Sequence, residues 1–295
     1  MSARIDTLVT VFGGSGFLGR HVIRELARRD YRIRVGVRRP ELAGHLQPLG
    51  RVGQIHPVQA NVRYPASVQA AARGASVVVN LVGILAQSGA QTFEAVQDKG
   101  AETVAQAAAD IGARMVHVSA IGADANSTSA YARTKAAGEW AVRGLCPQSW
   151  VVRTAWLYGA AGPTGFPKAM KRLAAARDSL TVVSDQVGQP TWTHDLAEAI
   201  VRLVESEAPY GMWHGTGSGQ CSWFDFARAT FEELGLDPER VQPITSAEYA
   251  AMYPAAAARP AYSVLSHERW EQAGIAPLPE WRDALHRAAP TVLAD

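Results

Sequence analysis

Tyr131 and Lys135 are the residues of this chain whose spacing is best suited to chemistry, in the segment SAYARTKAAGEW. Side chains four positions apart share one face of an α-helix, so a helix here would place a phenol beside an ammonium. The pKa of a free phenol is near ~10, and a neighbouring ammonium lowers it because it favours the phenolate. Tyr131 could then donate its proton to a carbonyl oxygen as hydride reaches the carbon, while Lys135 also holds the ribose of a nicotinamide cofactor. The alternative is an ordinary Tyr and Lys on an exposed helix.

Lysine is rare in this sequence, which adds weight to its appearance in the pair. Only four of the 29 basic residues are lysines. The pattern predicts a helix over Ala130–Val142, which Ser129 could cap, after a strand over Arg114–Ser119. Such a strand and helix would hold the Tyr-Lys pair at one end of a sheet.

A glycine-rich turn near the N-terminus predicts a phosphate-binding site. The apolar run Leu8–Phe12 reads as a strand, a GxxGxxG pattern follows, and apolar residues then recur with helical period from Val22 to Leu26. A helix N-terminus offers unpaired backbone N–H groups to an anion, and glycine lets a pyrophosphate approach the main chain closely. The pattern alone is common, and its place between a strand and a helix makes it specific. The expected cofactor contacts in this turn are Gly13, Ser15, Gly16, Phe17, Leu18 and Gly19.

Two arginines follow the second predicted strand, Tyr31–Val37. In a site for NAD an acidic residue usually stands here and holds the ribose 2′-hydroxyl. Here Arg38 and Arg39 stand in its place, and a guanidinium can bind a 2′-phosphate through two hydrogen bonds and stack on adenine. We therefore expect NADP(H) as the cofactor, the alternative being an ordinary solvated basic pair.

Two more predicted strands end in residues that could line the cofactor crevice. The strand Gln54–Ala60 precedes Asn61, which could hydrogen-bond the adenine amine or simply turn the chain. The apolar strand Ser76–Asn80 leads to an exposed backbone segment of the kind that borders a dinucleotide in a doubly wound sheet. The expected cofactor contacts from these two ends are Asn61, Val62, Leu81, Val82 and Gly83.

Length and charge limit the classes of protein that fit. The chain has 295 residues, 47% of them hydrophobic, enough for one large core or two unequal ones. Its formal net charge of +2 predicts neither nucleic-acid nor membrane attraction, and the apolar run Val77–Ala86 is too short to span a bilayer. No signal peptide is recognisable, and two isolated cysteines, Cys146 and Cys221, predict reduced thiols and a cytoplasmic protein.

Together these motifs resemble an extended short-chain dehydrogenase/reductase. The resemblance rests on GGSGFLG, NLVG, the serine that ends the Arg114–Ser119 strand, YARTK and RTAWLYG, and it covers nearly the whole chain. However, the two halves of the chain resemble different members of this family. Residues 1 to about 145 look most like the NADPH-binding accessory subunit of respiratory complex I, through VRRPELAGHLQPLG, NLVGIL and HVSAIGADANS. From about residue 150, RTAWLYGAAG, DQVGQPTWTHDLAEAI, SWFDFARA and RPAYSVL resemble dTDP-4-dehydrorhamnose reductase.

The divided resemblance leaves three functions open. The reductase half implies NADPH-dependent reduction of a 4-keto sugar nucleotide by a monomer or homodimer. The complex I half implies an NADPH-binding structural or assembly protein without turnover. A natural or engineered chimera would bind the cofactor with mismatched lobes. All eight tryptophans lie at or beyond Trp140, which fits such a mosaic.

The reductase resemblance also implies a role for a hydroxyl at the end of the fifth strand. In that family a threonine follows the strand-end serine and polarises the substrate carbonyl. Here the next residue is Ala120, so only Ser119 supplies a hydroxyl. Loss of one hydrogen-bond donor to a developing oxyanion can cost roughly 10²–10³ in rate.

The second half of the chain is expected to complete the sheet and form a substrate lobe. Strands over Trp150–Ala155 and Gly211–His214 and a helix over Asp195–Val204 extend an α/β Rossmann-type doubly wound parallel sheet. Residues 1–160, completed by 190–216, would bind the dinucleotide, and residues 161–189 and 217–295 would form the smaller lobe. The resemblance implies that Trp156 and Tyr158 contact the sugar, and a core aromatic is the alternative for Trp156.

Two weaker candidates complete the sequence. His194 and His214 suggest a metal, but we found no carboxylate or second histidine at ligand spacing and expect no metal site. Arg172 and Arg177 could meet a substrate diphosphate, although a solvated helix face is the usual place for such residues.

Overall fold

The protein folds around a seven-stranded sheet. The computed structural model describes residues 4–162, 165–254 and 259–294. The strand order is β11-β6-β5-β4-β1-β2-β3, and the pairs β1–β2, β1–β4, β2–β3 and β4–β5 are parallel. The strands are β1 (Leu8–Phe12), β2 (Arg32–Val37), β3 (Ile55–Gln59), β4 (Val77–Asn80), β5 (Arg114–Ala120), β6 (Ser149–Thr154) and β11 (Gly211–His214). This order confirms the expected α/β Rossmann-type architecture.

The order of the strands reverses between β1 and β4. The chain runs from β1 outward to β2 and β3, then returns to β4 on the other side of β1. Phe12 at the end of β1 is paired with Asn80 at the end of β4, so the loops that follow both strands leave the sheet side by side. Ligands of doubly wound sheets bind at such a reversal, outside the carboxyl ends of the strands.

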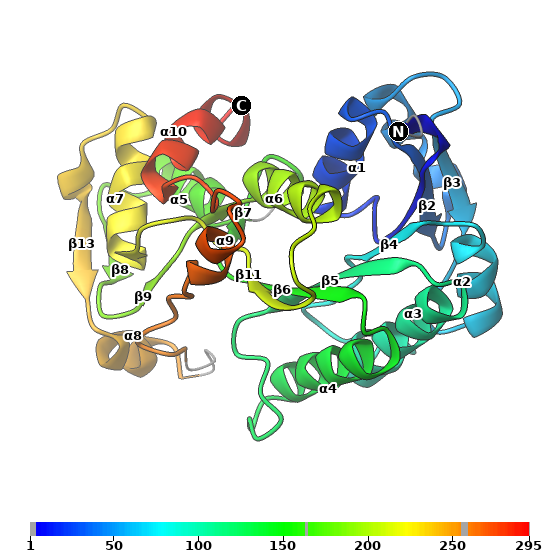
Figure 1. Cartoon of the computed structure of the whole chain (residues 1–295). Helices are drawn as coiled ribbons and strands as arrows, with labels where there is room; N and C mark the ends of the chain where they lie inside the picture. The colour runs from blue at the N-terminus through cyan, green and yellow to red at the C-terminus, as the bar shows by residue number, and fades with distance from the viewer. Residues whose placement is uncertain (1–3, 163–164, 255–258, 295) are drawn as a thin grey trace. The chain divides into compact units, whose positions relative to one another are not determined.

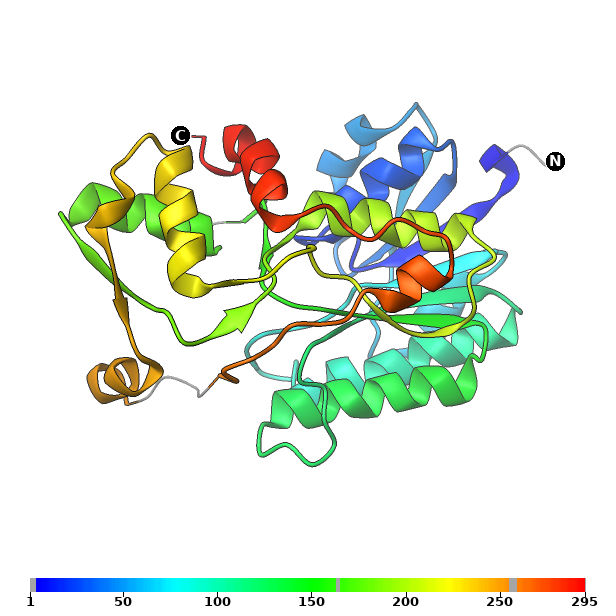
Figure 2. The ribbon, with the colours of Figure 1, turned by 60° about the vertical axis from the view of Figure 1, so that its left-hand side comes forward.

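Helices cover both faces of this sheet. Figures 1 and 2 show α1 (Gly19–Arg28) and α6 (Thr193–Glu205) over one face. The other face carries α2 (Pro65–Ala72), α3 (Lys99–Asp110) and α4 (Ala130–Leu145). Both faces of the sheet are therefore covered, which explains why the central strands β1 and β4 are nearly continuous apolar runs and are buried throughout.

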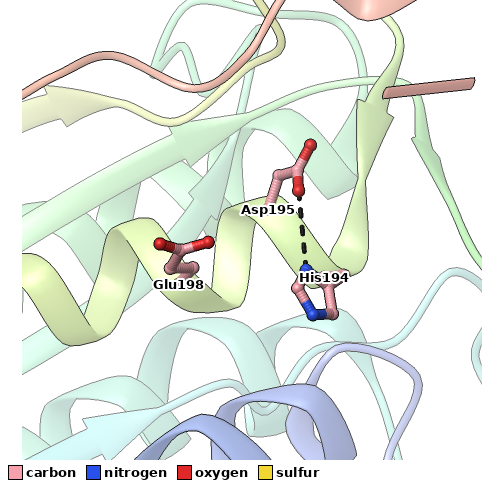
Figure 3. A group of neighbouring side chains, drawn as sticks. All are labelled: His194, Asp195 and Glu198. Carbon is pink, nitrogen blue, oxygen red and sulfur yellow. Dashed lines mark ion pairs between the residues drawn. The ribbon is translucent and has the colours of Figure 1, made fainter. Parts of the chain in front are cut away.

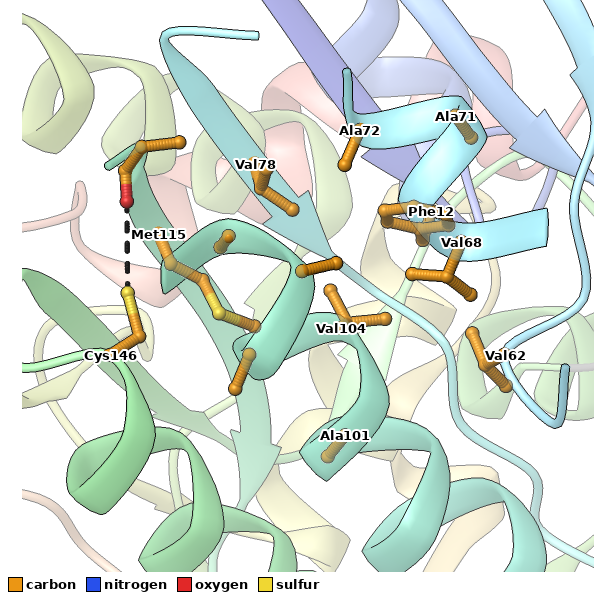
Figure 4. Close-up of a cluster of buried hydrophobic side chains, with 14 of the residues drawn as sticks. Phe12, Val62, Val68, Ala71, Ala72, Val78, Ala101, Val104, Met115 and Cys146 are labelled. Carbon is orange, nitrogen blue, oxygen red and sulfur yellow. Dashed lines mark hydrogen bonds between the residues drawn. The ribbon is translucent and has the colours of Figure 1, made fainter. Parts of the chain in front are cut away.

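The core on the α2–α3 side of the sheet is built from small and β-branched side chains (Figure 4). Phe12, Val78 and Met115 project from the sheet, and α2 and α3 lay alanines and valines against them. The Sγ atom of Cys146 lies at the edge of this cluster and donates to the carbonyl oxygen of Ala113 at 3.7 Å. Alanines let the helices approach the strands closely.

The chain divides into two compact units. The first extends to Arg153 and includes Ala197–Trp213, and the second comprises Thr154–Leu196 and the chain from His214 onward. From the sequence we expected the dinucleotide-binding part to extend to residue 160 and to include 190–216.

The remaining strands are β7 (Leu157–Tyr158), β8 (Leu180–Val183), β9 (Val187–Gly188), β10 (Thr191–Trp192), β12 (Cys221–Ser222) and β13 (Val241–Ile244). The remaining α-helices are α5 (Phe166–Ala176), α7 (Trp223–Glu233), α8 (Ser246–Met252), α9 (Glu268–Gln272) and α10 (Trp281–Val292).

In the second unit, short strand pairs alternate with helices. Strands β8 and β13 run parallel, as do β7 and β10, whereas β9 and β12 are antiparallel. Helix α7 packs on α5, and a capping box between Ser222 and Asp225 fixes its N-terminus. Short 3₁₀ turns complete the chain: η1 (Arg4–Asp6), η2 (Pro40–Leu42), η3 (Gly44–Leu49) and η5 (Pro238–Arg240).

Two local features differ from what the sequence pattern indicates. The pattern of Gln91–Ile111 is typical of one long α-helix, but this segment contains a π-helical stretch, η4 (Glu94–Asp98), that passes into α3. An insertion of this kind widens one turn, and a pattern of period 3.6 does not reveal it. Ser129 stands at the N-cap position of α4, but its side chain makes no cap hydrogen bond. The side chain of Ser127 instead accepts a hydrogen bond from the backbone N–H of Ser129.

Candidate active site

The glycine turn after β1 is closed and tightly packed. The N–H of Gly16 donates to the carbonyl oxygen of Gly13 at 3.0 Å, and Gly13 has a φ of 79°, a left-handed conformation that favours glycine. A Cβ on Gly19 would lie 2.3 Å from that same carbonyl oxygen and 2.6 Å from the backbone of Gly14. Helix α1 begins at this glycine, so its first N–H groups lie directly above the turn.

The segment after β4 forms the opposite wall of the turn. A Cβ on Gly13 would lie 3.0 Å from the carbonyl carbon of Leu81 and 3.1 Å from the nitrogen of Val82. The N–H of Leu81 continues the ladder by donating to the carbonyl oxygen of Phe12. Leu81 and Val82 are half-buried and Gly83 is exposed. Backbone thus meets backbone here, leaving no side chain between the turn and the loop.

The turn therefore fits a dinucleotide phosphate. Glycines whose Cβ atoms would strike backbone, followed directly by a helix N-terminus, are the features that a pyrophosphate needs. Ser15 and Phe17 are half-buried at the turn, and Leu18 is buried at the N-cap of α1. These residues would hold the phosphates of a nicotinamide dinucleotide.

The two arginines after β2 are exposed but already have protein partners. Arg38 donates to the side-chain oxygen of Gln91, and Arg39 forms an ion pair with Glu41 at 2.8 Å. Glu41 received no role from the sequence, because it lies two residues after Arg39 and not at the end of the strand, where NAD sites carry their acidic residue. Both arginine contacts are exposed and therefore weak, so a 2′-phosphate could displace them.

The end of β3 is a turn held by Asn61. Its Oδ1 accepts from the N–H of Arg63 at 3.1 Å, and its own N–H donates to Ser67. This is the chain-turning role that remained open for Asn61. The side chain of Val62 is buried in the cluster of Figure 4, so only its backbone could line a cofactor site.

Tyr131 lies on the first turn of α4 and packs edge-on against Phe93, with the ring centroids 5.7 Å apart. Burial raises the pKa of Tyr131 above its usual value. The expectation that Lys135 would lower this pKa was wrong, because burial outweighs any effect of the ammonium. The phenol therefore keeps its proton at neutral pH.

Lys135 is buried one turn further along α4. Its Nζ donates to the carbonyl oxygen of Val118 at 3.1 Å, and the side chain is only 5% exposed. Burial lowers the pKa of Lys135 to about 8, and the carboxylate of Glu139 acts in the opposite direction. Glu139 in turn holds Arg153 through hydrogen bonds of 2.9 and 2.7 Å. The lysine thus ties α4 to the end of β5.

Ser119 follows the carbonyl that binds Lys135. Its Oγ is buried and has no hydrogen-bond partner among the described residues. An unpaired hydroxyl costs free energy in a protein interior, so such a group is a candidate for binding a ligand. Ala120, the next residue, is half-buried and adds only a methyl group.

The aromatic residues expected to contact substrate lie in the second unit. Trp156 is half-buried, with an unusual positive φ of 48°, and its ring stacks on Trp223 at 3.5 Å between centroids. Tyr158 is fully buried among Phe226 and the residues of α10, and burial raises the pKa of its hydroxyl. The expectation that Tyr158 contacts the sugar was wrong, because the packing of α7 and α10 encloses it.

A carboxylate cluster adjoins His194, contrary to the sequence analysis. His194, Asp195 and Glu198 project from the first turns of α6, with one possible ligand atom from each lying within 4.8 Å of the others (Figure 3). The expectation that His194 has no carboxylate at ligand spacing was wrong. However, Arg287 holds both oxygens of Asp195, at 2.6 and 3.1 Å, and so competes with any cation. His214 is elsewhere, bonded through Nδ1 to Ser266.

Arg172 and Arg177 are exposed on and just beyond α5, which fits the solvated alternative.

Within the described part of the chain, no helix has the length and apolar character needed to cross a bilayer.

Two residues near this site received no role from the sequence. Asn80 and His117 are each 1% exposed, and Nδ2 of Asn80 lies 3.2 Å from Nδ1 of His117. The available signal was a polar residue at the end of one apolar strand, VVVN, and another inside a second, MVHVS. Only the register of β4 against β5 shows that the two face one another.

Comparisons with known proteins cover the whole chain. The family model described as RmlD substrate binding domain matches residues 7–293. A dTDP-4-dehydrorhamnose reductase of Mycobacterium tuberculosis is 35% identical, covering 98% of this chain and 94% of its own. A dTDP-4-keto-6-deoxy-D-glucose reductase of Streptomyces niveus is 42% identical over 71% of this chain and 76% of its own.

Solved structures of dTDP-4-dehydrorhamnose reductases are similar to this fold over nearly its whole length. A dTDP-4-dehydrorhamnose reductase of Bacillus anthracis, in complex with NADP, has a TM-score of 0.77 at 27% identity, covering 96% of this chain and 97% of its own. Another from Clostridium acetobutylicum has a TM-score of 0.79 at 29% identity, covering 98% and 100%.

The family model and the M. tuberculosis relative each match both sides of residue 145. The resemblance of the first half to a complex I subunit, and the chimera built on it, are therefore not supported. The same family accounts for the glycine turn of the first unit and for the tryptophan-rich second unit. The chain belongs to the dTDP-4-dehydrorhamnose reductase family.

Proposed function

We propose that this protein reduces the 4-keto group of a dTDP-linked 6-deoxy sugar with NADPH, with dTDP-4-dehydrorhamnose as the leading substrate. The single observation that carries the proposal is the arrangement around the end of β5. A protonated phenol, a buried lysine and a hydroxyl without a partner among the described residues come from two elements joined by the Lys135–Val118 hydrogen bond. The family of reductases to which the chain belongs supplies the substrate class.

Each of the three side chains has a distinct role in this proposal. When bound, NADPH supplies the hydride that reaches the keto carbon. Tyr131 donates its phenolic proton to the keto oxygen, and solvent then reprotonates the phenolate. The raised pKa of Tyr131 suits this direction, because the acid must hold its proton before the reaction.

Lys135 and Ser119 assist the proton transfer. As an ammonium, Lys135 stabilises the phenolate that forms when Tyr131 gives up its proton, and it would also hold the nicotinamide ribose of a bound cofactor. Ser119 donates its hydroxyl hydrogen to the keto oxygen as negative charge develops there. That hydrogen is available, because the hydroxyl has no hydrogen-bond partner in the part of the chain that the structure describes.

The cofactor and substrate would engage separate sets of residues. Gly13, Ser15, Gly16, Phe17, Leu18 and Gly19 would hold the pyrophosphate. Arg38 and Arg39 would bind the 2′-phosphate after leaving Gln91 and Glu41. The turn at Asn61 and Val62 and the backbone of Leu81, Val82 and Gly83 would border the dinucleotide. Trp156 offers a half-buried ring to a sugar.

The test is NADPH oxidation by the purified protein with dTDP-4-keto-6-deoxy sugars. Tyr131→Phe should lower kcat by at least ~10²-fold and leave NADPH affinity unchanged, because only the acid is lost. Tyr253→Phe is the matched control, since Tyr253 is exposed and is not among the residues assigned to the site. Turnover that survives in Tyr131→Phe would contradict the assignment of the acid. No turnover by the wild-type protein would contradict the proposed reaction.

We also propose a cytoplasmic enzyme that acts as a monomer or homodimer. Its two cysteines are free and buried, which suits a reducing compartment. Light scattering of the purified protein would give the mass, and a stable higher oligomer would contradict this proposal.

A further inference from the structure

A buried chain of hydrogen bonds leads from the cofactor-facing loop into the sheet. Asn80 ends β4, and His117 lies directly opposite it in the parallel register of β5. The Oδ1 of Asn80 accepts from the N–H of Val82 at 3.1 Å, and its Nδ2 faces Nδ1 of His117 at 3.2 Å. Both side chains are 1% exposed. The preceding pairs in this register, Val78–Met115 and Val79–Val116, are apolar, so Asn80 and His117 form a polar link at the end of an apolar ladder.

The link fixes the tautomer of His117. A backbone N–H can only donate, so the group that faces Val82 must be the amide oxygen of Asn80. The amide NH₂ therefore faces His117 and donates to Nδ1, which must be an acceptor. A neutral imidazole with an accepting Nδ1 carries its proton on Nε2. His117 is thus held as the Nε2–H tautomer by a contact that begins on the loop.

The surroundings keep His117 neutral. Burial and the charge of Lys135 lower its pKa to about 3, so the ring is uncharged at any pH at which the protein would operate. Its Nε2 has no hydrogen-bond partner among the described residues. A protonated ring would carry a hydrogen on Nδ1 as well as on Nε2, and the Nδ1 hydrogen would face the NH₂ group of Asn80. Two donors repel, so the Asn80–His117 hydrogen bond requires a neutral ring.

The other end of the link lies against the glycine turn. The peptide between Leu81 and Val82 is the one that a Cβ on Gly13 would meet at 3.0–3.1 Å. The orientation of this peptide therefore decides the distance between the loop and the turn. Leu81 is held on one side by the β1 ladder, and Val82 by Asn80.

We propose that Asn80 and His117 are a positioning pair, through which β5 sets the loop Leu81–Gly83 at the distance from the glycine turn that NADPH binding requires. This inference rests on the proposed function, since it takes this crevice as the NADPH site. His117 acts through Nδ1 as an acceptor and touches neither the cofactor nor the substrate.

Variants at His117 separate this role from simple packing. His117→Asn retains an oxygen near the position of Nδ1, whereas His117→Leu and His117→Gln do not. The expected result is an NADPH dissociation constant close to that of the wild type for Asn, and about tenfold weaker binding for Leu and Gln. Melting temperature is measured in parallel, because a purely structural role would lower it in all three variants without separating their NADPH affinities. Equal NADPH affinity in all three would overturn the proposal.

A second measurement needs no variant. In the wild-type protein without cofactor, hydrogen exchange at the Val82 amide should be slower than at Gly83 by at least about tenfold, since Asn80 holds the first and Gly83 is exposed. Equal exchange at the two amides would overturn the positioning pair even where variants fail to fold. A wild-type protein that binds no NADPH, but shows a protected Val82 amide, would instead contradict the proposed function.

Discussion

At the scale of single residues, the environment of Tyr131 and Lys135 differs from what their spacing suggested. The pKa of Tyr131 is raised and that of Lys135 is lowered to about 8, both chiefly by burial. Spacing alone predicted an ammonium that lowers the pKa of the phenol. Burial disfavours both charged forms, which leaves a protonated acid suited to reduction.

Ala120 provides a prediction at this scale. Ala120→Thr should raise kcat by about tenfold, because it would add a second hydroxyl donor beside Ser119 where charge develops on the keto oxygen. NADPH affinity should not change. Ala120→Val is the matched control, with the same branching and no hydroxyl. A similar rise with valine, or none with threonine, would show that the position does not act on the carbonyl.

Lys135 predicts a pH dependence of stability. Its folded-state pKa is about 8 against an ordinary value of 10.5, so between these values the unfolded chain binds more protons. The free energy of unfolding should therefore rise with pH across this window, on account of Lys135, by about 2–3 kcal/mol. Lys135→Met removes this contribution. Urea denaturation of both proteins at about pH 7.5 and about pH 10 checks the prediction, and a stability difference that is constant with pH would contradict it.

At the scale of elements, the glycine turn and the start of α1 depend on missing side chains. Gly19→Ala should destabilise the protein by about 2–3 kcal/mol and weaken NADPH binding, because the new Cβ would lie 2.3 Å from a backbone oxygen. Thermal denaturation and NADPH titration measure both effects. Gly44→Ala is the control, since a Cβ there meets nothing within 4 Å. Comparable effects of the two substitutions would indicate a general loss of backbone freedom rather than a clash.

Elements were predictable where their signals were local. The strands β1, β2 and β4 and the glycine turn follow from short apolar runs and glycine spacing. The π-helical turn η4 was not predictable from local signals. It lies where the chain packs closely against α4: a Cβ on Gly138 would lie 2.2 Å from the carbonyl oxygen of Gln97. Such close approach depends on a helix distant in sequence.

At the scale of the whole molecule, each compact unit holds one buried cysteine. Cys146 belongs to the first unit and Cys221 to the second, and burial raises the pKa of both thiols. Both should react slowly with a thiol reagent, because the thiolate is the reactive form and the side chains are enclosed. Bound NADPH should slow the reaction of Cys146 more than that of Cys221, since the glycine turn belongs to the first unit.

Mass spectrometry of the labelled peptides would resolve the two cysteines. Equal slowing at both would contradict a cofactor effect confined to the first unit, and unchanged labelling of Cys146 would contradict stabilisation of that unit by NADPH.

The Rossmann-type sheet, the glycine turn and the Tyr131–Lys135 spacing could be predicted from the sequence, because they depend on periodicity and on residues close together in the chain. The burial of Tyr158 by α7 and α10 and the pairing of Arg287 with Asp195 could not. The same holds for the Asn80–His117 contact and for the pKa values of Tyr131 and Lys135. These features depend on the three-dimensional packing, since burial and hydrogen bonding arise between elements that are distant in sequence.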